Sequence, residues 1–171
     1  HGVSKMASGD FWLFGDVGLQ AIDATGSSSR TLLTVQTGIS DVLVSDDGEQ
    51  VLVLSNGTVK SYQYQDQQLI LNQENVLGDG YSQLFAKRMV EDDAGRLWLS
   101  SDNGLVIKSD DGVQRLTVKD GLPSNLIVDV VMMHDGNSLV VTDAGLVQVN
   151  LEEKALPTVT PELRINQMQV N

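Results

Sequence analysis

Four segments of this chain repeat one pattern of two glycines and an apolar residue, and this repeat limits the fold more than any other feature. In each copy the glycines lie nine residues apart, and a large apolar residue follows the first glycine by three positions. The glycine pairs are Gly9 and Gly18, Gly48 and Gly57, Gly95 and Gly104, and Gly136 and Gly145, and the apolar residues are Trp12, Val51, Trp98 and Leu139. The copies start at residues 9, 48, 95 and 136, so the period is 39, 47 and 41 residues. A period near 40 with strand-type composition is typical of β-propeller blades.

Each copy indicates short strands joined by tight turns. An acidic pair such as Asp46 and Asp47 often precedes the first glycine, where Asp accepts backbone hydrogen bonds and Gly adopts a positive φ. A short apolar strand follows, a turn such as 102–104 makes a hairpin, and another strand leaves it. An apolar run also precedes each first glycine, and residues 128–133 are the clearest example of such an inner strand.

These strands predict an all-β fold, a partial β-propeller of about four four-stranded antiparallel blades followed by a C-terminal linker strand. The propeller fragment is predicted over residues 1–156, and its blades are predicted over residues 2–36, 39–74, 84–119 and 126–156. Residues 81–88 are interpreted mainly as the loop into the third inner strand, although their apolar spacing also suits a short helical turn.

The third and fourth copies carry a longer motif. Residues 120–125 are Asp-Gly-Leu-Pro-Ser-Asn, residues 91–99 are Glu-Asp-Asp-Ala-Gly-Arg-Leu-Trp-Leu, and residues 102–105 are Asp-Asn-Gly-Leu. Together these motifs resemble the two-component regulator propeller repeat. The second copy departs from that pattern, because Val51 replaces the Trp and Thr58 replaces the Leu.

The resemblance implies a parent protein of a particular kind. Such parents are membrane-bound sensors with an extracytoplasmic propeller, an immunoglobulin-like domain that contains spaced tyrosines, a transmembrane helix, and a histidine kinase or diguanylate cyclase output domain. Residues 157–171 contain Pro157, Pro161 and an apolar run, and they look like the linker and first strand of that immunoglobulin-like domain. The resemblance therefore implies a periplasmic location for the propeller.

The composition argues against several classes of site. The net charge of −12 repels phosphate backbones, which argues against nucleic-acid binding. Cysteine is absent, and the two histidines are His1 at the terminus and His134 in a turn. Acidic pairs next to glycine suit turns better than calcium loops, whose ligands usually alternate. We therefore predict no catalytic residues, no cofactor and no metal.

The aromatic residues divide into two groups. Trp12 and Trp98 hold the same repeat position, which favours packing between neighbouring blades over a sugar-stacking platform. Tyr62, Tyr64 and Tyr81 lie outside the repeat pattern and are the candidates for a ligand or partner surface. Tyr62 and Tyr64 alternate along one predicted strand, so both are expected on the same face.

The resemblance implies that the chain is a non-catalytic, ligand-binding fragment of an extracytoplasmic sensor propeller, with an oligosaccharide or another small molecule as a candidate ligand. The alternatives are a protein-interaction scaffold without a small ligand and, ranked last, a propeller lyase or hydrolase. Family rings usually have seven blades, so four blades leave apolar faces and strand edges uncovered. We expect those faces to meet missing blades or a second copy, or the chain to close as a four-bladed ring, and we expect the parent to be a homodimer.

Overall fold

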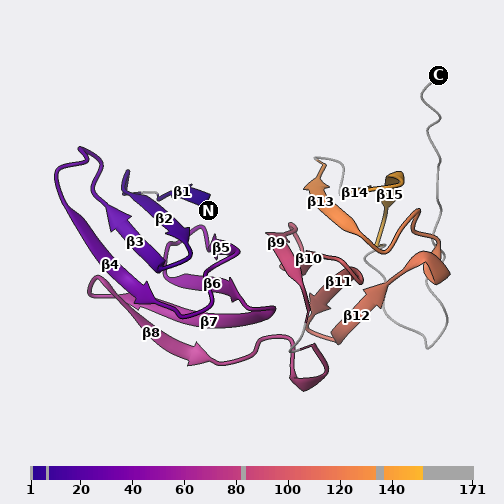
Figure 1. Ribbon diagram of the computed structural model, residues 1–171, viewed down its shortest axis with the longest axis horizontal. Helices are drawn as coiled ribbons and strands as arrows, with labels where there is room; N and C mark the ends of the chain where they lie inside the picture. The colour runs from indigo at the N-terminus through magenta and orange to yellow at the C-terminus, as the bar shows by residue number, and fades with distance from the viewer. Residues whose placement is uncertain (1, 7, 82–83, 134–136, 152–171) are drawn as a thin grey trace. The chain divides into compact units, whose positions relative to one another are not determined.

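The computed structural model describes residues 2–6, 8–81, 84–133 and 137–151, and these residues form antiparallel β-sheets with very little helix (Figure 1). Blade 1 consists of β1 (Gly2–Lys5), β2 (Phe11–Gly15), β3 (Gly18–Ile22) and β4 (Ser29–Thr34). Blade 2 consists of β5 (Asp41–Val44), β6 (Gln50–Ser55), β7 (Thr58–Gln65) and β8 (Gln68–Gln73). Blade 3 consists of β9 (Ala86–Glu91), β10 (Leu97–Ser101), β11 (Gly104–Ser109) and β12 (Gly112–Leu116). Blade 4 consists of β13 (Ile127–Met132), β14 (Ser138–Thr142) and β15 (Gly145–Val149).

The predicted all-β architecture of four blade sheets is confirmed, with one difference in strand number. In each sheet the strands pair in chain order, as an antiparallel meander requires. Blades 1, 2 and 3 have four strands, whereas the described part of blade 4 has three. The predicted C-terminal strand in residues 157–171 lies outside the described residues.

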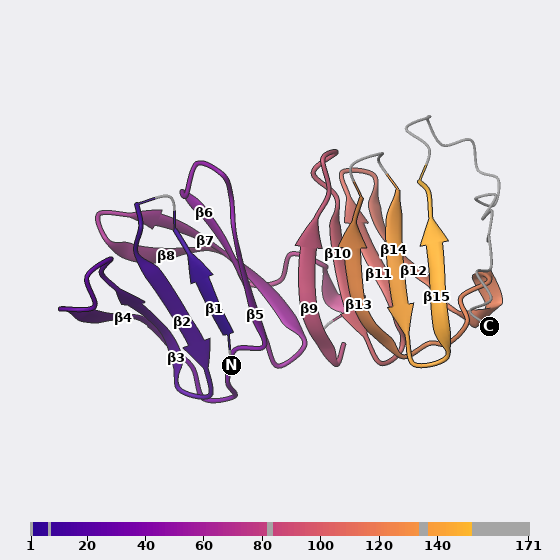
Figure 2. The ribbon, with the colours of Figure 1, turned by 90° about the horizontal axis from the view of Figure 1, so that it is seen from above.

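The chain divides into two compact units, His1–Met89 and Val90–Asn171, with the boundary inside β9. Blades 1 and 2 belong to the first unit, and most of blade 3 and all of blade 4 belong to the second. Each unit has a core between its two sheets, because one face of each sheet turns its alternate apolar residues toward the other sheet. In Figure 2 the strands β13, β14 and β15 lie side by side in chain order.

Both tryptophans lie in these cores, as the repeat predicts. Trp12 is 1% exposed and packs among Phe14, Leu19 and the blade 2 residues Val42, Val51 and Val53. Trp98 is 1% exposed and packs with Leu105, Val130 and Val140, the last two from blade 4. The shared repeat position is therefore the position that packs a blade against the next blade in the chain.

Blade 2 departs from the gapless alignment of the four copies. The connection between the paired residues Val44 and Val51 contains residues 45–50, whereas blade 1 uses only residues 6–10 between Lys5 and Phe11. Because side chains alternate along a strand, one added residue reverses which face each later side chain occupies. Val51 therefore faces blade 1 and does not take the position of a tryptophan.

The next hairpin of blade 2 is displaced by the same single residue. Its turn is Asn56–Gly57, and both residues are left-handed, with φ of 48° and 71°, as a type I′ turn requires. In blades 1, 3 and 4 the second repeat glycine instead begins the following strand, opposite Gly15, Ser101 or Thr142. The nine-residue glycine spacing thus fits two different hairpins.

The second glycine of blade 3 is required by a close approach of two backbone segments. Gly104 has φ of 106°, and a Cβ there would lie 2.5 Å from the Leu116 carbonyl oxygen. The Gly104 N–H also donates to the carbonyl oxygen of Asn125, at 2.7 Å. A larger residue at this position would push the start of β11 away from the end of β12.

The Asp-Gly-Leu-Pro-Ser-Asn motif forms that linker and begins at the end of the short 3-10 helix η2 (Val118–Asp120). Thr117 and Asp120 make a reciprocal capping box, in which the Asp120 carboxylate accepts the Thr117 backbone N–H at 2.8 Å. Gly121, with φ of 100°, ends the helix, and Leu122 enters the core between blades 3 and 4 with 4% of its surface exposed. The Asn125 side chain then accepts the Val118 N–H at 2.8 Å, which closes the turn.

A shorter linker between blades 1 and 2 reproduces the same device. Gly38 is left-handed with φ of 77°, and Ile39 after it is 4% exposed in the core between blades 1 and 2. The Ile39 N–H donates to the Gly15 carbonyl oxygen at 2.9 Å. A left-handed glycine followed by a buried aliphatic residue therefore anchors both linkers.

Candidate functional site

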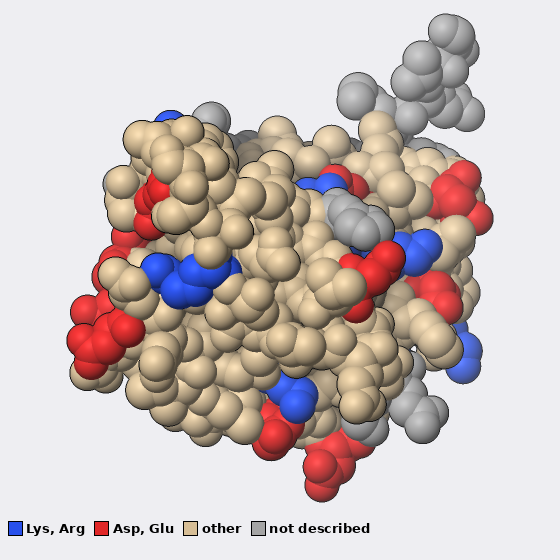
Figure 3. All heavy atoms as spheres, turned by 60° about the vertical axis from the view of Figure 1, so that its left-hand side comes forward, with Lys and Arg blue, Asp and Glu red and all other residues tan. Residues whose placement is uncertain are grey.

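The charged side chains give little indication of a binding centre. In the face shown in Figure 3, Asp and Glu form small separate groups with Lys and Arg between them, and most of that face is uncharged. Within residues 2–6, 8–81, 84–133 and 137–151, no group of three or more His, Cys, Asp or Glu side chains could hold a metal ion. The same residues include no helix long and apolar enough to cross a membrane.

The repeat glycines other than Gly136, which lies outside the described residues, occupy turns or strand starts. Gly9, Gly48 and Gly95 each close a turn by donating their N–H to the carbonyl oxygen three residues earlier. Gly18, Gly104 and Gly145 begin the second strand of a hairpin, and Gly57 lies in the turn itself. These residues shape the blades, which is the role the repeat predicts for them.

The tyrosines proposed as a ligand surface lie in three different environments. Tyr62 is 7% exposed inside the core of the first unit, and burial raises the pKa of its phenol. Tyr64 is half-buried on the same face and meets Trp12 edge to face, with the ring centroids 4.9 Å apart. Tyr81 ends the 3-10 helix η1 (Asp79–Tyr81) and is half-buried. The shared face of Tyr62 and Tyr64 packs against blade 1.

Tyr64 is also part of a polar contact between β4 of blade 1 and β7 of blade 2. Its hydroxyl oxygen accepts a hydrogen bond from Arg30 Nη2 at 2.9 Å, and Arg30 Nη1 donates to Gln67 Oε1 at 2.7 Å. Arg30 Nε is buried and has no hydrogen-bond partner among the described residues. No sequence pattern indicates this contact, because Arg30 and Tyr64 are far apart in the chain and outside the repeat pattern.

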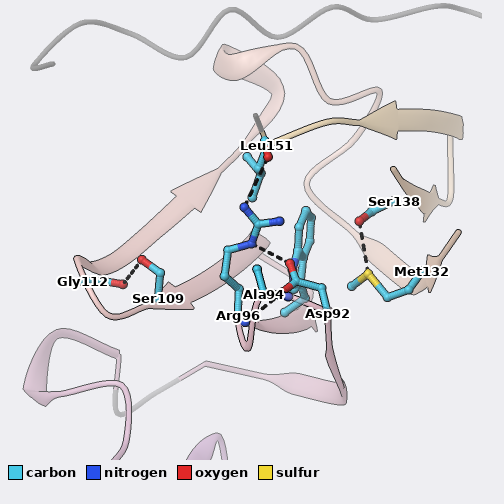
Figure 4. A network of polar contacts seen from close by, with 9 residues as sticks. Asp92, Ala94, Arg96, Ser109, Gly112, Met132, Ser138 and Leu151 are labelled. Carbon is cyan, nitrogen blue, oxygen red and sulfur yellow. Dashed lines mark hydrogen bonds and ion pairs between the residues drawn. The ribbon is translucent and has the colours of Figure 1, made fainter. Parts of the chain in front are cut away.

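A polar network in the second unit surrounds Asp92 (Figure 4). One carboxylate oxygen accepts the backbone N–H groups of Ala94 and Arg96, at 3.0 and 2.9 Å. The other accepts Trp98 Nε1 at 2.7 Å and Arg96 Nε at 2.6 Å. Asp92 therefore connects the turn before β10 to the tryptophan that fills the blade core.

Electrostatics keep Asp92 ionised. Partial burial of the carboxylate acts to raise its pKa, but the hydrogen bonds from Trp98 and the Arg96 backbone, together with the Arg96 guanidinium, outweigh that effect and lower the pKa below its ordinary value. Arg96 also reaches blade 4, because its Nη1 donates to the Leu151 carbonyl oxygen at 3.3 Å. These four donors to the Asp92 carboxylate all belong to blade 3, so the network ties the turn before β10 to the blade core.

Two exposed loops use the same chemistry without a core partner. Asp47 accepts bonds from the Ser45 hydroxyl and the Glu49 N–H, and Asp23 accepts bonds from Thr25, Ser27 and Ser28. These bonds hold the pKa of each carboxyl below its ordinary value. Both carboxylates are occupied by their own turns, as predicted for the acidic residue beside Gly48.

Comparisons with solved structures show the fold. The chain matches the extracellular domain of the hybrid two-component system BT3049 from B. thetaiotaomicron with a TM-score of 0.70 and 16% identity, over 90% of this chain and 22% of that one. It matches the extracellular domain of BT4673 from the same organism with a TM-score of 0.66 and 18% identity, over 86% of this chain and 23% of that one. This chain therefore spans less than a quarter of each of those proteins.

Propellers of other kinds match as well. A protein described as a 6-phosphogluconolactonase, from Bacteroides fragilis, gives a TM-score of 0.63 at 16% identity, over 96% of this chain and 52% of that one. No family model and no curated protein matches the sequence. At these identities the likeness shows that the chain has β-propeller architecture, and the resemblance to the two-component regulator repeat remains a matter of its motifs.

Proposed function

We propose that this chain supplies non-catalytic blades to the extracytoplasmic sensor propeller of a membrane-bound signal-transduction receptor. The observation that carries the proposal is the fold likeness to extracellular domains of two-component systems, at TM-scores of 0.70 and 0.66 over most of the chain. The motifs at 91–99 and 120–125 support it from the sequence. The motif resemblance supports a periplasmic location for the propeller, and we propose that the receptor is a homodimer.

The contacts of the polar residues support a role without chemistry in these blades. The Asp92 carboxylate is surrounded by four fixed donors, and Trp98 is enclosed in a core, so neither is available to a substrate. A sensor propeller of this kind binds an oligosaccharide or another small solute and transmits the binding energy through its ring. Tyr81, which is half-buried outside the described blade cores, remains the residue we assign to such a ligand surface.

The location is tested by antibody labelling of source cells. An antibody against this chain should label cells whose outer membrane has been permeabilised while the inner membrane is intact. An antibody against a cytoplasmic protein serves as the control and should label only after lysis. Labelling of this chain that also requires lysis would reject an extracytoplasmic sensor.

The ligand is tested by thermal unfolding of the chain in the presence of oligosaccharides and other small solutes. A ligand should raise the unfolding temperature in a saturable way, because binding to the folded state stabilises it by RT ln(1 + [L]/Kd). Tyr81→Ala should reduce that rise, and Tyr64→Phe, which changes a tyrosine facing the blade core, should preserve it. A flat result across the panel would instead favour a protein-interaction scaffold, which the exposed apolar faces of blades 1 and 4 make the second candidate.

A further inference from the structure

Blade 1 exposes a row of apolar side chains on the face opposite its core. β2 alternates in burial, so that Trp12 and Phe14 enter the core while Phe11 and Leu13 lie on the other face, each 38% exposed. Val3, paired with Leu13, is 60% exposed on that face. We call the surface of Val3, Phe11 and Leu13 the leading face.

The leading face corresponds, position by position, to a face that is fully packed in blade 4. The repeat aligns residue 9 with residue 136, so Val3 and Leu13 correspond to Val130 and Val140. These residues also pair identically, Val3 with Leu13 and Val130 with Val140. Val130 is 6% exposed and Val140 is 0% exposed, because both pack against blade 3.

Blade 4 exposes the complementary surface. Val131 and Leu146 are 49% and 44% exposed, and Leu139 and Val141 beside them are half-buried. Leu139, Val141 and Leu146 correspond to Trp12, Phe14 and Leu19, which are buried in blade 1 against blade 2. We call the surface of Val131, Leu139, Val141 and Leu146 the trailing face.

We propose that the leading face of one copy of this chain packs on the trailing face of a second copy. The leading and trailing faces correspond to the two sides of the blade-to-blade interface that the chain already forms once in each unit. A second copy carries both halves in the required register, so its trailing face fits a leading face in the same way that blade 3 fits blade 4. The contact is heterologous, because it joins different surfaces of the two copies.

The first test measures mass by sedimentation equilibrium over a range of concentrations. The wild-type chain should rise from 18.5 kDa toward multiples of that mass, and the rise should persist at high salt because the contact is apolar. Leu13→Lys in the leading face and Leu146→Lys in the trailing face should each hold the mass at 18.5 kDa. Val17→Lys is the matched control, since Val17 is 71% exposed in the β2–β3 turn and belongs to neither face.

Mixing separates a heterologous contact from the other arrangements. Leu13→Lys retains an intact trailing face, and Leu146→Lys retains an intact leading face. An equal mixture should therefore form dimers with one contact, and the mass should not rise beyond twice that of one chain. Circular dichroism of each variant should match the wild type, which shows that the lysines have not unfolded the blades. A wild-type chain that stays at 18.5 kDa at every concentration would overturn the proposal, because the faces would then be satisfied within one copy. Association that survives either single variant would overturn it as well, since it would use another surface.

Discussion

The Asp92 network predicts that one carboxylate stabilises the second unit more than any other charged residue in its turns. Replacing Asp92 with Ala removes the acceptor of four hydrogen bonds at once. The indole N–H of Trp98, a residue that is 1% exposed, would keep no acceptor in the core, and an unsatisfied buried donor costs about 1–3 kcal/mol. The two lost turn bonds resemble a lost helix cap, at about 1 kcal/mol.

The Arg96 ion pair contributes less to this total. The Arg96 side chain is 21% exposed and can turn toward water once its partner is gone, so we assign the pair about 0.5 kcal/mol. The free energy of unfolding should therefore fall by about 3 kcal/mol in Asp92→Ala. Urea unfolding followed by circular dichroism measures this, because it does not depend on the tryptophan that the mutation disturbs.

Two variants isolate the cause. Asp93→Ala removes the same charge from an exposed neighbour and should change the free energy of unfolding by less than about 0.5 kcal/mol. Trp98→Phe removes the indole donor, so Asp92→Ala should cost about 1–2 kcal/mol less in that background than in the wild type. If the losses of stability in Asp92→Ala and Trp98→Phe simply add in the double variant, the Trp98–Asp92 hydrogen bond does not hold the turn to the core.

Three further predictions follow from the same contacts. Gly104→Ala should lower the free energy of unfolding by at least about 2 kcal/mol more than Gly112→Ala, because both glycines have positive φ but only Gly104 lies against a carbonyl oxygen. Equal urea midpoints of the two variants would mean that the positive φ alone causes the loss. Leu122→Ala should lower the free energy of unfolding, measured by thermal unfolding, by about 2–5 kcal/mol, whereas Val118→Ala should lower it by under about 0.5 kcal/mol because Val118 in the same linker is 48% exposed. Similar losses would mean that Leu122 does not anchor blade 4. In urea titrations, the difference in free energy of unfolding between wild type and Asp92→Asn should be constant above about pH 5 and shrink as the pH falls below about 4, because the pKa of Asp92 is lower in the folded than in the unfolded chain. A difference that grows on acidification would mean that folding raises this pKa.

The sequence predicted the features of this fold that depend on nearby residues. The turns at Gly48 and Gly95, the inner strands, and the burial of both tryptophans follow from residues within one copy of the repeat. Turn chemistry and alternation act over a few residues, which makes them readable without any knowledge of tertiary contacts. The Asp120–Thr117 capping box is equally local, because its two residues are three positions apart.

Contacts that reach beyond one turn could not be predicted in the same way. Nothing near Asp92 in the sequence indicates that its second oxygen binds Trp98, and nothing near Gly104 indicates the Asn125 carbonyl oxygen. Tyr64 was assigned to a candidate ligand surface, but its ring meets Trp12 of another blade. Such pairings depend on which face each strand turns inward, and a repeat pattern specifies that face only when the strand register is known.

Blade 2 shows how one residue decides that question. Its glycines keep the nine-residue spacing, but the longer β5–β6 connection turns Val51 toward blade 1 and carries Tyr62 with it. The Asn56–Gly57 pair is the available signal, because both of its residues are left-handed and form the turn, whereas in the other blades the positive-φ glycine follows the turn and begins the next strand. Blades 1 and 4 lack this displacement, and their inner strands pair in the same register. The leading face of blade 1 and the trailing face of blade 4 can therefore be matched residue by residue. The same alignment fails for blade 2, because it pairs Val51 with Trp12 although Val51 lies on the opposite face of its strand.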